Sequence, residues 1–438
     1  MFDPMILNPC RIRIEKRGKT AYLLDAFSHL AWELNDSSYL ICQDLLNGKQ
    51  PEETADHLHN TFHGLSSDQA LEEVQSFISE LNRRSFILEE DHIISWVPRL
   101  RKVTFGVTDR CNLRCKHCLA SSTLDQANDL PLEKIAQLSV ELHELGCKSV
   151  SLFGGEPLLR EDLWDIVHLF KKNGVEVRIN TNATLADGTF AKRAREEKIS
   201  LFTASLDGSA PSVHDPLRGK GSFKKALAGI RTLLEEENRI ILSVTVNRLN
   251  YSDMADMTRL ARELGVLKIR FNEVHFNGNA ACFQEEIRLK GKEKLQAIKA
   301  ILEIEKQDGD FVTGSLLDQA RIVNSVSAET PLNFPLVVAP CGAGMGSVCI
   351  RPDGNVTPCE ILWDSICGNV FHEPLERIYY HNSVMNRFRQ PLIITEEDVP
   401  GCAGCQYVRP CFIGHRCAPF YFTGGTLNQK KCYTCWMK

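Results

Sequence analysis

The chain has 438 residues, a formal net charge of −5, and ordinary hydrophobic and charged fractions of 43% and 24%. This length predicts two or three globular domains with substantial cores. The small net charge and the lack of a long basic block argue against nucleic acid as a partner. The N-terminus has no cationic stretch followed by an apolar run, and no segment is long enough to span a bilayer. We therefore expect a cytoplasmic protein with no membrane partner.

Seventeen cysteines are the most unusual feature of the composition. Disulfides are disfavoured in a reducing compartment, so grouped cysteines indicate metal binding. Three cysteines lie at positions 111–118, and nine more belong to a group between positions 341 and 435. The other five are isolated and are expected to be small buried hydrophobic residues: Cys10, Cys42, Cys147, Cys282 and Cys367.

Residues 1–95 are predicted to form a separate winged-helix-like domain. Two short strands, 11–15 and 20–24, flank a turn at Arg17-Gly18, and three helices follow. Asp36 is expected to cap the first helix, and Pro51 is expected to open the second. In the third helix, apolar residues repeat at helical spacing: Leu71, Val74, Ile78 and Leu81.

Strand-like and helix-like segments alternate through residues 100–285. The predicted strands are 103–108, 149–153, 175–179, 200–205, 240–246 and 267–271, and helical stretches such as 131–145, 161–173 and 222–237 separate them. This alternation predicts an α/β fold with parallel strands and helical crossovers, arranged as a partial (β/α)6 barrel. Catalytic residues of α/β barrels lie at the C-terminal ends of the strands.

The three cysteines Cys111, Cys115 and Cys118 follow the first predicted strand at C-x3-C-x2-C spacing. Iron–sulfur clusters are held by cysteine thiolates, normally one for each iron. Three ligands therefore predict a four-iron cluster with one iron open to another ligand, and open coordination is typical of reactive metal centres. A zinc knuckle that lacks a ligand and a chance grouping are the alternatives.

Polar residues follow the later strands. A ligand with an amine, a carboxylate and a ribose would suit them, since carboxylates accept from ammonium groups and arginine binds carboxylates in bidentate fashion. Each is singly more typical of a turn. They are Gly154-Gly155-Glu156-Pro157, Thr181-Asn182, Ser205, Asp207, Arg218, Asn247 and the stretch 277–280.

Together with the cysteine triplet, Gly154-Gly155-Glu156-Pro157 makes residues 103–280 resemble a radical S-adenosylmethionine (SAM) enzyme. The resemblance implies that SAM chelates the open iron and is cleaved to a 5′-deoxyadenosyl radical. It assigns Glu156 to the SAM amine, Ser205 and Arg218 to its carboxylate, Asn182 or Asp207 to the ribose, and His117 to the adenine. The implied SAM-binding set is His117, Gly154, Gly155, Glu156, Pro157, Asn182, Ser205, Asp207, Arg218 and Asn247.

The C-terminal cysteines begin after a predicted connector, 286–335, with a helix at 293–306. Zinc ribbons are one interpretation of their C-x2-C pairs. The C-x2-C-x5-C run and the G-x4-C ending at Cys359 instead make residues 336–438 resemble the SPASM extension of radical SAM enzymes, which carries two auxiliary [4Fe-4S] clusters. The resemblance implies three clusters in all. It assigns Cys341, Cys349, Cys359 and Cys417 to one auxiliary cluster, and Cys402, Cys405, Cys411 and either Cys432 or Cys435 to the other.

The N-terminal region resembles the peptide-recognition domain related to the pyrroloquinoline-quinone chaperone. Residues 34–36, 45–49 and 77–81 carry this likeness, and a generic winged helix is the alternative. The resemblance implies that the leader of a ribosomally made precursor peptide adds as a strand near residues 20–34 and packs on the third helix.

These parts predict an enzyme that forms a carbon–carbon or thioether crosslink in a precursor peptide, with the auxiliary clusters accepting the electron. Flavodoxin or ferredoxin is the expected electron donor. Glu360 follows a predicted ligand cysteine and is a candidate base, although an ordinary carboxylate is the simpler interpretation. A maturase of folded proteins, of the anaerobic sulfatase-maturing type, and an electron-transfer protein without radical chemistry are the alternatives.

Overall fold

The computed structural model describes residues 7, 12–17, 19–25, 31–87, 99–125, 128–325, 336–338, 342–389 and 392–394. The chain divides into two compact units. The first comprises residues 1–98, 333–341 and 387–403, and the second comprises residues 99–332, 342–386 and 404–438. Each unit contains its own hydrophobic core.

The first unit begins with an antiparallel sheet in the order β1-β2-β3, followed by three helices. The strands are β1 (Ile12–Arg17), β2 (Thr20–Asp25) and β3 (Ala31–Leu34), and the helices are α1 (Asp36–Leu46), α2 (Pro51–Thr61) and α3 (Ser67–Arg83). Leu23 of the sheet packs in one buried core with Ile41, Leu58 and Val74 of the helices. Strand β3 is an addition to the two strands that the sequence predicts.

Asn35, and not Asp36, caps helix α1. The side-chain oxygen of Asn35 accepts a hydrogen bond from the Ser38 amide at 2.9 Å, and the Asn35 backbone is extended. Asp36 is the first helical residue, where its charge lies at the positive end of the helix dipole. Asparagine and aspartate cap helices about equally well, so the sequence alone does not decide between two adjacent candidates.

Replacing Asn35 with alanine should lower the free energy of unfolding of helix α1 by about 1 kcal/mol, because the Ser38 amide loses its acceptor. Asp36→Ala is the matched control and should cost only a few tenths of a kcal/mol, since it removes a charge near the dipole and no cap. Hydrogen exchange of the α1 amides in the full chain measures both effects. A larger loss for Asp36→Ala would reverse the assignment of the cap.

A ten-stranded sheet in the order β10-β9-β8-β7-β6-β5-β4-β12-β13-β14 forms the second unit. Its six long parallel strands are β4 (Lys102–Thr108), β5 (Ser149–Gly154), β6 (Glu176–Thr181), β7 (Leu201–Ser205), β8 (Ile240–Val246) and β9 (Lys268–Glu273). They coincide with the six strands predicted from the sequence. The predicted α/β fold with a partial barrel of parallel strands is confirmed.

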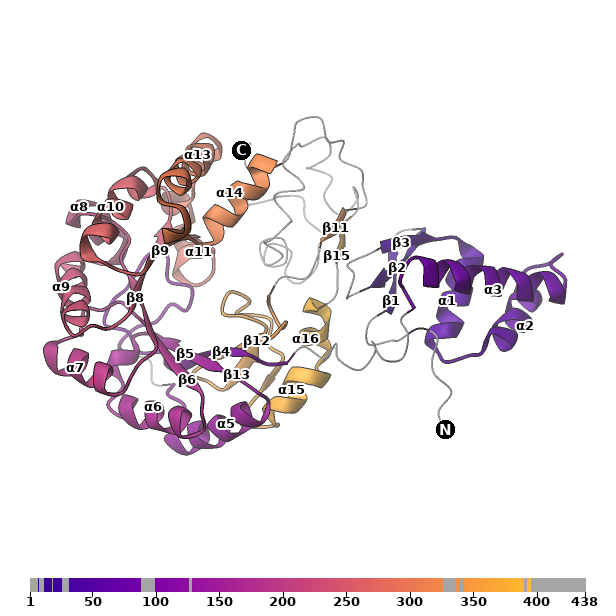
Figure 1. Cartoon of the computed structure of the whole chain (residues 1–438), viewed down its shortest axis with the longest axis horizontal. Helices are drawn as coiled ribbons and strands as arrows, with labels where there is room; N and C mark the ends of the chain where they lie inside the picture. The colour runs from indigo at the N-terminus through magenta and orange to yellow at the C-terminus, as the bar shows by residue number, and fades with distance from the viewer. Residues whose placement is uncertain are drawn as a thin grey trace. The chain divides into compact units, whose positions relative to one another are not determined.

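Helices cover the outer side of this curved sheet (Figure 1). They are α5 (Leu132–Glu144), α6 (Leu163–Lys172), α7 (Gly188–Glu196), α8 (Pro211–Arg218), α9 (Ser222–Glu235) and α10 (Met254–Leu264). The core lies between sheet and helices, where the rings of Phe105 and Phe170 meet edge to face at 5.1 Å. Alternate strand residues face the opposite, inner side of the sheet.

The sheet continues beyond β9 through the connector region. Helices α11 (Asn279–Cys282), α12 (Gln284–Ile287) and α13 (Gly291–Asp308) lead to β10 (Val312–Thr313), which pairs in parallel with β9 and precedes α14 (Ser315–Ser325). The helix predicted at 293–306 lies within α13. The described part of the predicted connector, residues 286–325, therefore adds a strand to the barrel sheet.

On the other side of the sheet, β12 (Ser347–Ile350) pairs in parallel with β4, and β13 (Asn355–Thr357) and β14 (Gly368–Asn369) follow in antiparallel order. Helices α15 (Leu375–His381) and α16 (Ser383–Phe388) come next along the chain. A separate two-stranded sheet, in which β11 (Leu336–Val338) pairs with β15 (Leu392–Ile394), belongs to the first unit. A region far along the chain thus extends the sheet directly beside the strand that precedes the cysteine triplet.

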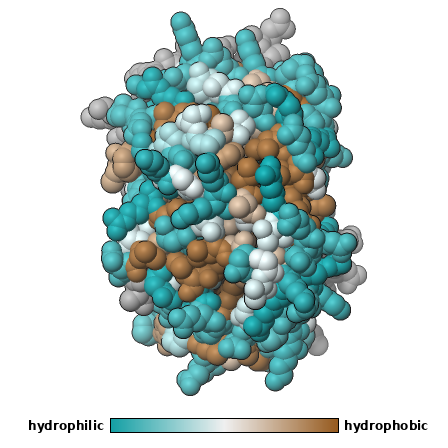
Figure 2. Space-filling view, turned by 90° about the vertical axis from the view of Figure 1, so that its left-hand side faces the viewer, coloured by the Kyte–Doolittle hydropathy of each residue, from teal (hydrophilic) through white to brown (hydrophobic). Residues whose placement is uncertain are grey.

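The face of the molecule in Figure 2 is mainly hydrophilic, with hydrophobic patches between polar side chains. In the part of the chain that the structure describes, no helix is both long and apolar enough to cross a membrane.

Candidate functional site

The cysteine triplet lies in the loop that follows β4. The Cys111 amide donates to the Thr123 carbonyl at 3.2 Å, and the Cys118 amide donates to the Cys115 carbonyl at 3.2 Å. Cys115 is buried, whereas Cys111 and Cys118 are half-buried. Burial raises the pKa of Cys111 to about 12 and that of Cys115 to about 11. Without iron these thiols are therefore neutral, and metal binding would release their protons.

The loop beyond β9 holds the cysteine loop in place. The Asn279 amide donates to the Cys118 carbonyl at 2.9 Å, and the Asn279 side chain donates to the Cys115 carbonyl at 3.2 Å. Gly278 has a φ of +54°, and a Cβ there would lie 2.5 Å from the Leu119 carbonyl oxygen. Within the stretch 277–280 that follows the sixth predicted strand, Gly278 and Asn279 therefore support the cysteine loop.

The predicted pair Gly154-Gly155 allows a close approach of backbone to backbone. A Cβ on Gly154 would lie 1.9 Å from the Thr108 carbonyl oxygen, and one on Gly155 would lie 2.0 Å from that of Arg110. The Gly155 amide donates to the Thr108 carbonyl at 2.8 Å. The assignment of this pair to SAM stays a prediction, and its close neighbours within the protein are the end of β4 at Thr108 and the start of the cysteine loop at Arg110.

Glu156 is 1% exposed and accepts three hydrogen bonds. Its donors are the Thr181 hydroxyl at 2.6 Å, the Asn182 amide at 2.7 Å and the Leu158 amide at 3.2 Å, beside the short helical turn opened by Pro157. Burial raises the pKa of Glu156 to about 7, although these hydrogen bonds oppose the shift. The ionised form of such a buried carboxylate would be stabilised by a cationic partner such as an ammonium group.

Asn182 connects the third strand end to the cysteine loop. Its side-chain amide donates to the Asn112 side chain at 2.9 Å, and its oxygen accepts from the Thr184 amide at 2.9 Å. Asn247 instead serves the turn after β8, where it donates to the Thr245 carbonyl at 2.8 Å and accepts from the Leu249 amide at 2.9 Å. Ser205 is the half-buried last residue of β7.

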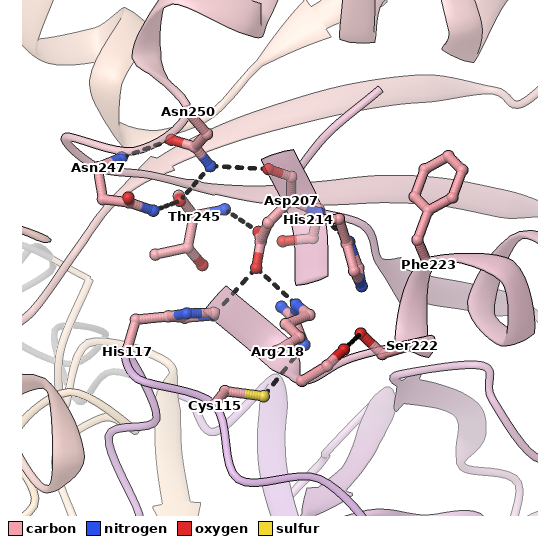
Figure 3. Close-up of polar contacts among 12 residues, drawn as sticks. Cys115, His117, Asp207, His214, Arg218, Ser222, Phe223, Thr245, Asn247 and Asn250 are labelled. Atoms are coloured by element: carbon pink, nitrogen blue, oxygen red, sulfur yellow. Dashed lines mark hydrogen bonds and ion pairs between the residues drawn. The ribbon is translucent and has the colours of Figure 1, made fainter. Parts of the chain in front are cut away.

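A buried charge network joins the fourth strand end to the cysteines (Figure 3). Asp207 is fully buried, and its Oδ2 lies 2.5 Å from Arg218 Nε and 3.2 Å from His117 Nε2. Arg218 Nη1 in turn lies 3.9 Å from the Cys115 sulfur. Burial alone would raise the pKa of Asp207, but the charge of Arg218, the neighbouring histidines and the hydrogen bond from the Thr245 amide together outweigh it and lower this pKa to about 2. The network thus places a fixed cation beside a predicted cluster ligand.

His117 offers an acceptor to a ligand. Burial lowers its pKa to about 4, so the ring is neutral, and the Asp207 carboxylate oxygen 3.2 Å from Nε2 favours the tautomer that carries its hydrogen on Nε2. Its Nδ1 is buried and has no hydrogen-bond partner among the described residues. A neutral ring that donates at one nitrogen accepts at the other. The orphaned nitrogen fits a ligand with an N–H group, as the adenine of SAM has.

Two of the predicted auxiliary cysteines lie within the described residues. Cys349 is fully buried on β12, and burial raises its pKa well above the usual value, whereas Cys359 is half-buried. Glu360 accepts a hydrogen bond from the Thr104 hydroxyl of β4 at 3.4 Å. The other predicted auxiliary ligands, Cys341, Cys402, Cys405, Cys411, Cys417, Cys432 and Cys435, lie outside the described residues.

Within the described ranges, no three His, Cys, Asp or Glu side chains lie close enough together to share one metal ion. A single zinc ion requires such convergence. In an iron–sulfur cluster each thiolate binds a different iron, so the cysteine sulfurs need not meet at one point. The loop of Cys111, Cys115 and Cys118, with buried or half-buried thiols and a neighbouring cation, fits a cluster.

Comparison with known proteins agrees with this geometry. Residues 106–261 match the family model of the radical SAM superfamily, and residues 341–406 match that of the SPASM iron–sulfur cluster-binding domain. An AdoMet-dependent heme synthase of Oleidesulfovibrio alaskensis is 26% identical over 77% of this chain and 88% of its own length. Mycofactocin maturase MftC of Mycolicibacterium smegmatis is 27% identical over 76% of this chain and 83% of its own.

The structure of Streptococcus suis SuiB bound to its precursor peptide SuiA has a similar fold, with a TM-score of 0.56 and 12% identity over 87% of this chain and 90% of that one. The strand-end site and the matched domains define an enzyme of the radical SAM class. This chain is a radical SAM enzyme with an iron–sulfur cluster-binding SPASM domain.

Gly155→Ala should disrupt the cysteine loop, because its Cβ would lie 2.0 Å from the Arg110 carbonyl oxygen. We expect the iron content per chain after anaerobic reconstitution to fall by about a third, which is the share of one cluster among the three [4Fe-4S] clusters expected. Gly188→Ala is the matched control, since no atom lies within 4 Å of an added Cβ there. Full iron content in Gly155→Ala would show that the contact with Arg110 is not needed.

Glu156 should make the metal-free protein less stable as the pH rises. Its pKa of about 7 in the folded chain exceeds its usual value of 4.5, so the folded state binds more protons between these values, and stability is lost as the pH rises through 7. The loss should reach about 3 kcal/mol. Glu156→Gln does not titrate, and the difference between the two unfolding curves at pH 5 and pH 8 isolates the effect. Parallel curves would contradict the raised pKa.

Proposed function

We propose that this enzyme modifies a ribosomally made precursor peptide, whose leader binds the first unit while a core residue enters the barrel. The product carries an intramolecular carbon–carbon or thioether crosslink. Bound at the site, the cluster and SAM supply a 5′-deoxyadenosyl radical that abstracts a hydrogen atom from the peptide. A crosslink is a net oxidation, which gives the auxiliary clusters a role as electron acceptors.

The observation that carries the proposal is the open edge of the first unit's sheet. In the sheet order β1-β2-β3, no described strand pairs with the outer edge of β3. The predicted strand-addition region, 20–34, includes central strand β2, which is paired on both sides, so within the described part of this region β3 is the strand with a free edge. Adding a strand to a free edge gives backbone hydrogen bonds with little demand on sequence.

An aromatic platform lies beside this edge. Trp32 of β3 stacks on Phe77 of α3 with ring centroids 4.9 Å apart, and Phe86 lies 6.1 Å from Trp32. The Arg84 guanidinium lies over the Trp32 ring at 4.3 Å. Trp32 and Phe77 are only half-buried, so they retain surface for an apolar side chain. Strand β3 would supply backbone pairing and the platform would supply side-chain contacts.

At the cluster site, the chain's residues have separate roles in this proposal. Glu156 accepts from the SAM amine, Arg218 and Ser205 face its carboxylate, and Asn182 or Asp207 faces the ribose. Arg218 is already paired with Asp207, which offsets its charge. It would therefore bind the SAM carboxylate mainly through an oriented N–H donor. The pair Gly154-Gly155 and the turn residues Pro157 and Asn247 hold the strand ends that carry these groups.

Beyond the barrel, Cys341, Cys349, Cys359 and Cys417 would hold one auxiliary cluster, and Cys402, Cys405, Cys411 and either Cys432 or Cys435 the other. Glu360, next to Cys359 and within reach of Thr104, would accept the proton lost as the crosslink forms. A flavodoxin or ferredoxin would deliver the reducing electron.

Heme synthases and MftC match similar shares of this chain, so the shared domains alone favour neither a tetrapyrrole nor a peptide. The first unit supports the peptide, since an open sheet edge beside an aromatic platform suits the addition of a peptide strand. It favours a leader-bearing peptide over a folded protein for the same reason.

Trp32→Ala should weaken binding of the precursor encoded beside this gene by at least tenfold, because the platform loses its central ring. SAM cleavage without peptide should not change, since Trp32 belongs to the other unit. Phe62→Ala is the matched control: Phe62 packs partly buried on the same core from the end of α2 and should leave affinity intact. Fluorescence anisotropy of labelled precursor measures binding. Equal affinity for Trp32→Ala and wild type would remove the platform from the proposal.

A further inference from the structure

Two arginines lie on the inner face of the barrel sheet. Arg178 stands between Val177 and Ile179 on β6, and both of these neighbours are buried in the core beneath the helices. On β9, Arg270 stands in the same way between buried Ile269 and Phe271. Since successive strand residues face opposite sides, both arginines point away from the helix-covered core and into the barrel.

One carboxylate faces this pair. Glu360 accepts a hydrogen bond from Thr104, another inner-face residue, whose row on the sheet continues through Ser151 to Arg178. Burial lowers the pKa of Arg270, the charge of Glu360 opposes this shift, and the charge of Arg178 adds to it. Two guanidinium groups therefore share the inner face with Glu360, and the other carboxylate in contact with Arg178 is Glu176 at the exposed start of β6.

The guanidinium donors of the pair are poorly used. Arg178 Nε is buried and has no hydrogen-bond partner among the described residues. The ion-pair contact of Arg178 is with Glu176, at 3.7 Å, on the exposed start of the same strand. For Arg270, no hydrogen bond or ion pair to another described residue occurs. Unsatisfied buried donors are costly, and a planar guanidinium matches a carboxylate in bidentate geometry.

We infer that Arg178 and Arg270 form an anion-binding site inside the barrel that holds a carboxylate of the segment being modified. The carboxylate belongs to an acidic side chain or to the C-terminus of the peptide. This inference rests on the proposed function for the identity of the substrate, and it specifies which residue type must accompany the reacting one.

The position of the pair suits this role. Arg178 precedes Thr181, the strand-end residue that contacts Glu156, by three positions, or about 10 Å along the strand. A carboxylate bound by the arginines would lie deeper in the barrel than the strand ends. The next residue of the peptide would then lie toward the cysteine loop. The anchor would fix the reacting carbon relative to the radical, which is a positioning role.

Protection from arginine modification tests the site without any turnover. The reconstituted full-length enzyme is labelled with phenylglyoxal, and labelling at Arg178, Arg270 and exposed Arg259 is quantified by mass spectrometry. N-acetylglutamate α-amide offers a side-chain carboxylate, N-acetylglutamine a terminal one, and N-acetylglutamine amide none. We expect at least fivefold slower labelling of Arg178 and Arg270 with a carboxylate ligand, and no change at Arg259. The more protective ligand identifies the source of the carboxylate.

Variants then test the role in the reaction. Arg178→Gln and Arg270→Gln should each lower the amount of modified peptide per 5′-deoxyadenosine at least tenfold, because SAM is still cleaved but the peptide is misplaced. Arg→Lys at the same positions should restore part of the coupling by restoring charge. Arg259→Gln on α10 is the matched control, and iron content and melting temperature show that the fold is kept.

Equal labelling with all three ligands would overturn the anion site, as would unchanged coupling in both glutamine variants. If the wild-type enzyme modifies no precursor, the proposed function fails, and the protection experiment still decides whether the arginines bind a carboxylate.

Discussion

The buried pair of Asp207 and Arg218 is the interaction on which the site depends. Asp207 follows β7, accepts from the Thr245 amide of β8 at 2.7 Å, and meets His117 of the cysteine loop. Breaking a buried pair by removing one partner costs about 3–5 kcal/mol, because the remaining charge is left uncompensated. One carboxylate therefore joins two strand ends, helix α8 and the cysteine loop, and it fixes a cation beside Cys115. Other polar residues of the site are arranged around this network.

Much of the barrel follows from local sequence, because its strands and helices alternate with clear periodicity. Strands β4 to β9 fall where the apolar runs predict them. Strand β3 is only four residues long, and Trp32 and Glu33 give it no clear alternation, so the sequence does not reveal it. The pairing of β12 with β4 joins residues 245 positions apart. Nothing in either segment specifies its partner, because that choice depends on packing of the whole sheet.

The candidate site likewise contains some residues that the sequence reveals and others that only the folded structure reveals. Cys111, Cys115, Cys118 and Glu156 stand out because their spacing is rare and their chemistry is specific. Asn112 and Asn279 hold the cysteine loop, yet isolated asparagines near loops are common and their role exists only in three dimensions. Asn247 forms turn hydrogen bonds that the sequence does not reveal, and its assignment to SAM stays a prediction. Supporting residues of this kind would be found only from the folded geometry.

The parallel ladder between β12 and β4 has a consequence for electron transfer. Cys349 stands opposite Thr104 in this ladder, and Cys111 follows Thr104 by seven residues. A redox group held by Cys349 would be spaced from one held by Cys111 through the ladder between β12 and β4 and the short stretch of chain from Thr108 to Cys111. Electron tunnelling falls steeply with distance, so its rate between the two positions would stay constant while peptide segments enter and leave. The sheet would thereby act as a fixed spacer for redox groups as well as a scaffold.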